Sequence, residues 1–145
     1  MSRWTLLALL LFSLSCNSNN LRIVKVKVLY DPQAKFQTVI ATKLQKVRDQ
    51  KLMTSERANI DIHEAAPGAN TFHRIIAGTG GVPLHDFDIV VLDPNQPDLS
   101  NTVKQALNSS RNACAPQATC MAFVGSWISG ERKEATEQVF AELTK

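Results

Sequence analysis

The sequence predicts an α/β fold: a three-layer, doubly wound, mainly parallel sheet of about four strands with helices on both faces. Three observations predict it. Strand-like and helix-like segments alternate along the chain. The first strand-like segment is β-branched and nearly apolar throughout, and the third contains an unbroken apolar run, as mostly buried strands require. The helix-like segments each have one apolar face, and such alternation favours parallel strands joined by helical crossovers.

The first strand is expected at residues 22–30, RIVKVKVLY, whose alternate residues point to opposite faces of a sheet. On one face lie Val24, Val26, Val28 and Tyr30, and on the other Ile23 and Leu29. The helix expected next gathers Phe36, Val39, Ile40, Leu44 and Val47 on its apolar face. Asp31 and Pro32 suit the turn that leads into it.

Three further strand and helix pairs follow. The strands are expected at ANIDIHEA (58–65), FDIVVLD (87–93) and MAFVGSWI (121–128). The helices are expected within PGANTFHRIIAG (67–78), within PNQPDLSNTVKQALNSS (94–110) and within WISGERKEATEQVFAEL (127–143). In the last of these, Ser129 is expected to cap the helix, and Glu131 suits the positive end of the helix dipole. This helix is expected to pack on the same sheet as the first helix.

The first 15 residues have the layout of a secretory signal peptide. Arg3 supplies the positive charge, an uncharged apolar run follows from Leu6 to Leu14, and small residues precede Cys16. SLSC resembles a bacterial lipobox, which predicts lipidation of Cys16 and a polar tether, NSNN, up to residue 20. An ordinary signal peptidase using Ser13 and Ser15 is the alternative. Residues 21–145 are expected to form one domain.

The three cysteines are Cys16, Cys114 and Cys120. An odd count in an exported protein leaves one thiol over, and lipidation of Cys16 would remove it. We therefore expect a disulfide between Cys114 and Cys120, as an oxidising compartment allows. The spacing is not the redox-active C-x-x-C, so a structural bridge is the favoured interpretation.

The formal net charge is +3, and it becomes +2 once Arg3 is removed. Basic and acidic residues are interspersed, so no nucleic-acid partner is expected. His63, His73 and His85 lack metal-ligand spacing, and GTGGVP (78–83) suits a helix stop better than a phosphate loop. GSWISG lacks the order of a serine nucleophile elbow. We expect no cofactor, no metal and no catalytic residue.

Polar residues gather after the strands, where ligands bind in doubly wound sheets. Asp31 and Gln33 follow the first strand, and Asp93 follows the third. PGANT follows the second, and its helix N-terminus is a potential anion site in which Gly68 allows close approach and Asn70 or Thr71 adds a donor. Plain helix capping by the same residues is the alternative.

Two segments together resemble bacterial extracellular solute-binding proteins of the type II periplasmic class, most closely the molybdate/sulfate-binding-like branch that also occurs joined to von Willebrand A domains. The first is PGANTFHRIIAGTGG…DFDIVVLDP. The second, SWISGERKEATEQVFAEL, is similar to the family's late W-V-S-G-E-x-R-E-A-A-E-x-F segment, whose helix returns to the first lobe. The resemblance covers Ile23 to about Asn95 and Cys120 to Leu143.

By position, the resemblance implies ligand groups at the Asp31–Gln33 turn, at Asn70 and Thr71, and at Asp93. DPQA stands where oxyanion binders of the family usually offer a serine, and the carboxylate of Asp31 would repel an anion. The stretch between the third strand and the final segment is too short for the family's second lobe. A single lobe buries little of a ligand, so weak binding is expected.

These observations favour an envelope-anchored, non-enzymatic, solute-binding-like lipoprotein domain facing the periplasm or the exterior. Its partners would be a small solute or an envelope protein, such as a permease or a von Willebrand A-type protein. One alternative is a small envelope enzyme of flavodoxin- or thioredoxin-like type that uses Cys114 and Cys120. Another is a truncated gene product without an independent role.

Overall fold

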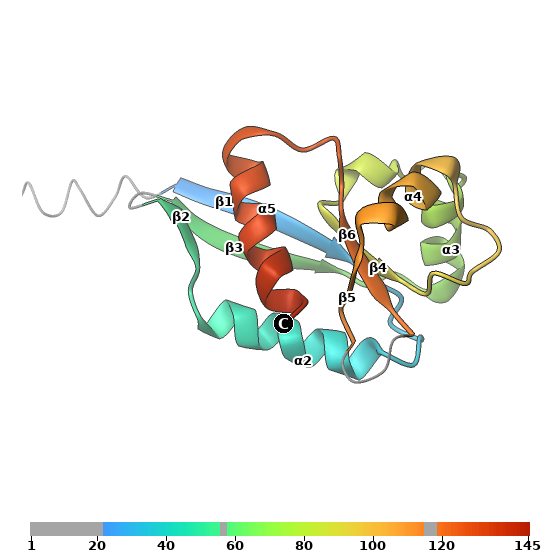
Figure 1. Ribbon diagram of the computed structural model, residues 1–145, viewed down its shortest axis with the longest axis horizontal. Helices are drawn as coiled ribbons and strands as arrows, with labels where there is room; N and C mark the ends of the chain where they lie inside the picture. Colours follow the sequence, from blue (N-terminus) through green and yellow to red (C-terminus); the bar gives the residue numbers. More distant parts are fainter. Residues whose placement is uncertain (1–21, 56–57, 115–118) are drawn as a thin grey trace, which may run out of the picture.

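The computed structural model describes residues 22–55, 58–114 and 119–145; the expected signal peptide, Cys16 and the tether lie outside this part of the chain. Six strands form one sheet in the order β2-β3-β1-β4-β6-β5 (Figure 1). Their bounds are β1 Arg22–Leu29, β2 Met53–Ser55, β3 Ala58–Ala65, β4 Ile89–Leu92, β5 Arg111–Asn112 and β6 Met121–Val124. The fold is therefore α/β, with the four expected strands present and two short edge strands added.

The sheet is mixed, and this corrects the expectation of a mainly parallel one. Strands β3, β1 and β4 are parallel, whereas β6 is antiparallel to β4. The reason lies in β5, a two-residue strand that the sequence did not reveal. It follows α4 in the parallel direction, and β6 then turns back as its hairpin partner, between β5 and β4. The sequence expectation treated β6 as the first strand after the crossover and therefore assigned it the wrong direction.

Helices cover both faces of the sheet, as predicted (Figure 1). On one face lie α2 (Gln37–Asp49) and α5 (Gly130–Leu143), and on the other α3 (Ala69–Ala77) and α4 (Asn101–Ala106). The first core includes Val26, Val28, Ile40, Leu44, Val139 and Leu143, and the second includes Leu29, Phe72, Ile76, Val90 and Phe123. The first and last helices thus pack on the same sheet, as expected, and in addition they lie on the same face of it.

Helix ends agree with the sequence in part. α3 stops at Gly78, whose φ of 79° is the left-handed conformation that glycine tolerates. Two details were wrong: Val39 is 37% exposed instead of facing the core, and Ser129 occupies the N-cap position of α5 without a side-chain hydrogen bond. Across the described residues, none of the helices has the length and apolar character needed to cross a membrane.

Candidate functional site

The carboxyl ends of β1 and β4 border a hollow of about 300 Å³. The turn after β1, the first turns of α3, the turn after β4 and the residue before Cys120 all contribute to it. Its lining consists of Asp31, Gln33, Ala34, Lys35, Phe36, Phe72, Asp93, Gln96 and Thr119. This is the edge where doubly wound sheets bind ligands, so the hollow is the candidate site.

Asp31 is the most buried charged group of the hollow, with 9% of the residue exposed. One carboxylate oxygen, Oδ1, accepts the Gln33 main-chain N–H at 2.9 Å, and the other, Oδ2, lies 4.0 Å from Nε2 of His73. Gln96 Nε2 lies 2.9 Å from His73 Nδ1. Because an amide nitrogen only donates, Nδ1 is the acceptor, and the ring presents its remaining proton toward Asp31.

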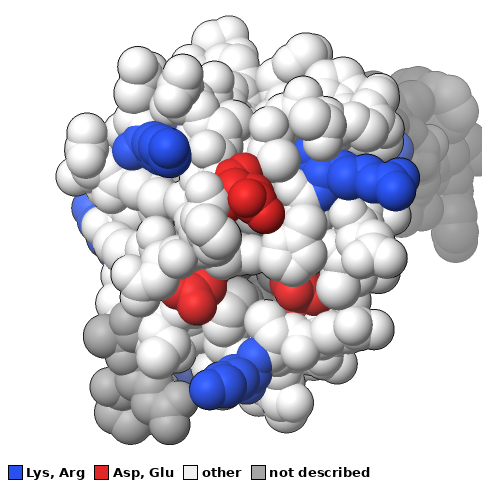
Figure 2. All heavy atoms as spheres, turned by 90° about the vertical axis from the view of Figure 1, so that its right-hand side faces the viewer, with Lys and Arg blue, Asp and Glu red and all other residues white. Residues whose placement is uncertain are grey.

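Asp93 repeats the arrangement of Asp31 on the neighbouring strand. Its Oδ1 accepts the Asn95 main-chain N–H at 2.9 Å, which fixes the turn after β4. The lining contains these two carboxylates and one ammonium group, that of Lys35. Figure 2 shows this end of the molecule, with acidic side chains in the middle of the face and basic ones nearer its rim. The hollow therefore suits a positively charged or donor-rich group better than an anion.

The sequence-predicted residues divide into two groups. Gln33 and Asp93 line the hollow together, although they follow different strands. Gly68, Asn70 and Thr71 are exposed at the start of α3 and are not among the lining residues. Gly68 occupies the N-cap position of that helix, as the capping alternative allows, but no side chain makes a capping hydrogen bond there.

Sequence reasoning missed Gln96, Thr119 and the two aromatic walls. Gln96 lies three residues after Asp93 in the same turn, which is a signal that could have included it. Phe36 and Phe72 were assigned to the core, and each is at most 6% exposed, yet part of each ring borders the hollow. Thr119 reaches it only because the β5–β6 hairpin turns at this edge of the sheet.

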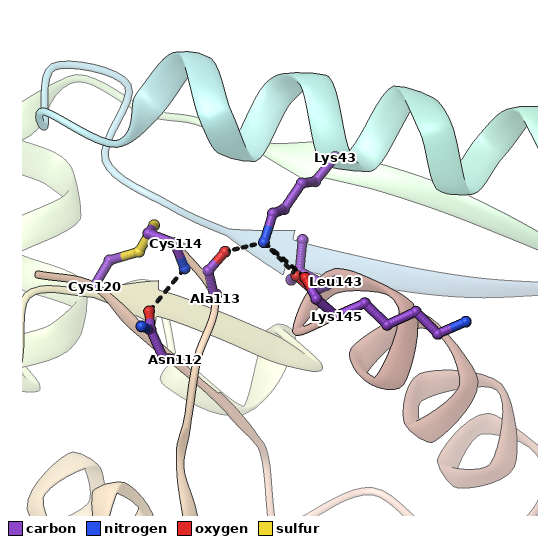
Figure 3. The surroundings of a disulfide bond; sticks show 7 residues. All are labelled: Lys43, Asn112, Ala113, Cys114, Cys120, Leu143 and Lys145. Carbon is purple, nitrogen blue, oxygen red and sulfur yellow. Dashed lines mark hydrogen bonds between the residues drawn. A yellow bond between two sulfur atoms is a disulfide. The ribbon is translucent and has the colours of Figure 1, made fainter. Parts of the chain in front are cut away.

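Cys114 and Cys120 form the predicted disulfide, with Cα atoms 5.7 Å apart (Figure 3). The two residues are 4% and 0% exposed, within the core beneath α2 and α5. Residues 115–118 of the bridged loop lie outside the described residues. Exchange-active cysteines are partly exposed, so burial favours a structural bridge over the redox alternative.

Lys43 joins this bridge to the last helix (Figure 3). Its ammonium donates to the carbonyl oxygen of Ala113 at 2.6 Å and to that of Leu143, the last residue of α5, at 3.2 Å. Burial lowers the pKa of Lys43. A cation at a helix C-terminus satisfies free carbonyl groups and complements the helix dipole, so Lys43 fastens α2 to both neighbours.

The two segments that carry the family resemblance meet at the opposite, amino edge of the sheet. Asp88, 1% exposed, precedes β4 and accepts the Lys27 main-chain N–H at 2.7 Å. It also accepts from Nε of Arg132 at 2.6 Å, and a second guanidinium nitrogen pairs with the same carboxylate. The buried carboxylate therefore ties β1, β4 and α5 together.

Trp127 makes the second connection between these segments. Its indole N–H donates to the Phe87 carbonyl oxygen at 2.9 Å, and the ring lies where a Cβ on Gly125 would stand. The Gly125 N–H donates to the Asp88 carbonyl oxygen at 2.8 Å. Gly125, Trp127 and Arg132 thus have structural partners at the amino edge, away from the hollow.

Within the described residues, no group of three or more histidine, cysteine, aspartate or glutamate side chains is placed to hold a metal ion. Asp31, His73 and Asp93 are therefore not assembled as a metal centre. No protein-family model matches this chain, and no curated protein or solved structure matches it either.

Proposed function

We propose that this chain is an envelope-anchored, non-enzymatic binding domain that resembles one lobe of an extracellular solute-binding protein. Its ligand would be held weakly at the carboxyl edge of the sheet. One observation carries the proposal: Gln33 and Asp93, which the resemblance implicates separately, line one hollow together with Asp31 and Gln96.

The chemistry of the hollow narrows the ligand class. Asp31 and Asp93 would attract an ammonium or guanidinium group, while the Gln33 and Gln96 amides and the Thr119 hydroxyl could hydrogen-bond polar substituents. Sulfate-like oxyanions would meet two carboxylates. A single open side leaves much of the ligand in water, which favours weak binding.

The contacts between the two family-like segments also support the proposal. The resemblance implies a last helix that returns to the first lobe, and the Asp88–Arg132 and Phe87–Trp127 contacts join those two segments. A permease or a von Willebrand A-type protein is the partner that the same resemblance suggests.

Ligand titration followed by NMR and calorimetry tests the binding role. The mature chain carrying Cys16→Ser would be titrated with lysine, putrescine, calcium, sulfate and molybdate. We expect amide shifts at Gln33 and Gln96 with the two amines, and about tenfold weaker binding after Asp31→Asn or Asp93→Asn. Asp49→Asn, on α2 outside the hollow, is the matched control.

Other outcomes would redirect the proposal. Shifts at Gly68, Asn70 and Thr71 with the oxyanions would favour the anion site at the start of α3 and contradict the cation preference. If none of the five ligands produces amide shifts or heat, small-solute binding is overturned and a protein-interaction role is left.

The anchoring part has a separate test. Lipidation of Cys16 predicts that the wild-type chain sediments with membranes and that Cys16→Ser releases it to the soluble fraction. Ser13→Ala, three residues before Cys16, leaves the acceptor cysteine in place and serves as a control. Equal membrane association of the wild type and Cys16→Ser would refute lipidation.

A further inference from the structure

Within the part of the chain that the structure describes, the amino half of β1 has a free edge on its β4 side. β1 pairs with β3 along its whole length, but it pairs with β4 only at Val28 and Leu29. The preceding residue on this side, Lys27, exchanges both main-chain groups with Asp88: its N–H meets the carboxylate and its carbonyl accepts the Asp88 N–H at 2.9 Å. The Asp88 side chain thus ends the ladder where a strand would continue it.

Main-chain groups of Ile23 and Lys25 face this free edge. The Tyr30 N–H is directed to Ala65 of β3, so even-numbered residues of β1 point to β3 and odd-numbered ones to the other side. Among the described residues, no strand lies opposite Ile23 or Lys25 there. Unpaired strand edges of this kind are templates for a further strand.

A groove of about 750 Å³ lies along this edge. Ile23 and Lys25 line it on β1, His85 and Asp86 on the segment before β4, and Glu131 and Arg132 at the start of α5. Ile23 is 66% exposed, an unusual state for a large apolar side chain at a sheet. The groove therefore offers main-chain pairing, an apolar contact and space beside the edge.

The charges of the groove select its occupant. Arg132 is paired with Asp88 and Arg22 with Glu131, whereas Lys25, Lys27 and Asp86 make no ion pair within the described residues. The unpaired lining charges are therefore two lysines and one aspartate, an excess of positive charge. Two copies of β1 side by side would set lysines against lysines, which opposes self-pairing. The chain's own first 21 residues contain no acidic residue. An acidic segment of another protein fits best.

We propose that this β1 edge binds an extended acidic segment of a partner protein by strand addition. The segment would pair with the main chain of Ile23 and Lys25, and its carboxylates would lie beside Lys25 and Lys27. This inference does not rest on the solute site, which lies at the other end of the sheet.

Peptide titration tests it. The mature chain carrying Cys16→Ser would be titrated with the peptide TEVEVEVT, and with two controls: TKVKVKVT and a form of the acidic peptide N-methylated at alternate residues. We expect the amides of Ile23 and Lys25 to shift and to gain hydrogen-exchange protection with the acidic peptide. Binding should be about tenfold weaker for both controls, one lacking the charge match and the other the main-chain donors.

Charge reversal sharpens the test. Lys25→Glu with Lys27→Glu should transfer the preference to the lysine peptide, while Lys133→Glu, exposed on α5, should change nothing. A thermal melt checks that each variant is folded. The proposal would be overturned if the amide chemical shifts of Ile23 and Lys25 did not change at millimolar concentrations of the acidic peptide. Equal binding of the N-methylated form, protection of both amides before any peptide is added, or a stable dimer would also overturn it. Shifts confined to Gln33 and Gln96 would bear on the solute site alone.

Discussion

The two ends of the sheet use the same residue types for opposite purposes. At the amino edge, the carboxylate of Asp88 is buried and bonded to Lys27 and Arg132. At the carboxyl edge, Asp31 and Asp93 each use one oxygen to fix a local turn and border an open hollow. Fully partnered polar groups indicate a structural role, and polar groups that face a hollow are available to a ligand.

The segment that carries the family resemblance and the residues of the candidate ligand site lie in different parts of the molecule. The final segment that most resembles the binding-protein family provides Trp127 and Arg132, and both hold α5 to the sheet. The hollow is built from short turns with less distinctive sequence. The distinctive residues of this segment therefore have structural roles, while the candidate ligand site is formed by other residues.

One substitution made at both ends tests this contrast most strongly. Asp88→Asn sets an amide against the donors of Lys27 and Arg132, so we expect a loss of about 3 kcal/mol in unfolding free energy. Asp31→Asn keeps the oxygen that accepts the Gln33 N–H, and its unfolding free energy should stay within about 0.5 kcal/mol of the wild type. Urea denaturation measures both, and equal losses would contradict the comparison.

A glycine pair gives the next largest effect. Gly125→Ala pushes a methyl group into the Trp127 indole and should destabilise by about 2 kcal/mol. Gly68→Ala meets no atom within 4 Å and has an ordinary extended backbone, so the lower entropy of the unfolded chain offsets the poorer N-cap and the change should stay within about 0.5 kcal/mol. A neutral Gly125→Ala would show that the Trp127 indole is not held against Gly125. Thermal denaturation of both variants decides this.

Lys51 is a position at the end of α2 where the structure is strained. Its φ of 53° is the left-handed conformation, which costs a non-glycine residue energy. Lys51→Gly relieves this strain but increases the conformational entropy of the unfolded chain. We expect a net gain of about 0.5 kcal/mol in unfolding free energy. Lys46→Gly, within α2, should instead destabilise. A loss with Lys51→Gly in urea would contradict the assigned backbone conformation.

The ionisation of Tyr30 is expected to lower the stability of the fold at alkaline pH and to have no effect at neutral pH. Burial, assisted by the hydrogen bond to Glu64, raises its pKa from 10.0 to about 12. The folded state prefers the neutral phenol, so this stabilisation is complete below pH 10.0 and is lost as the pH rises toward about 12. Tyr30 is the only tyrosine, so tyrosinate absorbance reports it alone. Glu64→Gln should lower the midpoint, and ionisation near pH 10.0 without unfolding would contradict the burial.

The sequence predicted the elements of the fold better than their directions. The four longer strands and the faces of the helices follow from periodicity, because apolar residues recur where each element is buried. The periodicity of a strand does not reveal whether it runs parallel or antiparallel to its neighbour. Arg111 and Asn112 are polar and too few to form a pattern, yet as β5 they determine that β6 is antiparallel.

The site was predicted in part for a similar reason. Gln33 and Asp93 follow strands that run parallel, so their meeting follows from topology. Asn70 and Thr71 also follow a parallel strand, but the residue of α3 that lines the hollow is Phe72. Thr119 depends on a hairpin that could not be predicted, and which side chain of a turn faces a hollow depends on tertiary packing.

The disulfide also makes this chain a favourable host for an inserted domain. Cys114 and Cys120 hold the two arms of the β5–β6 hairpin with Cα atoms 5.7 Å apart, at the edge that borders the hollow. Domain termini often lie close together, so a guest domain spliced between these cysteines would join the host at two points that are already close in space. The disulfide would keep the two attachment points together, so movements of the guest would not separate the two arms of the hairpin.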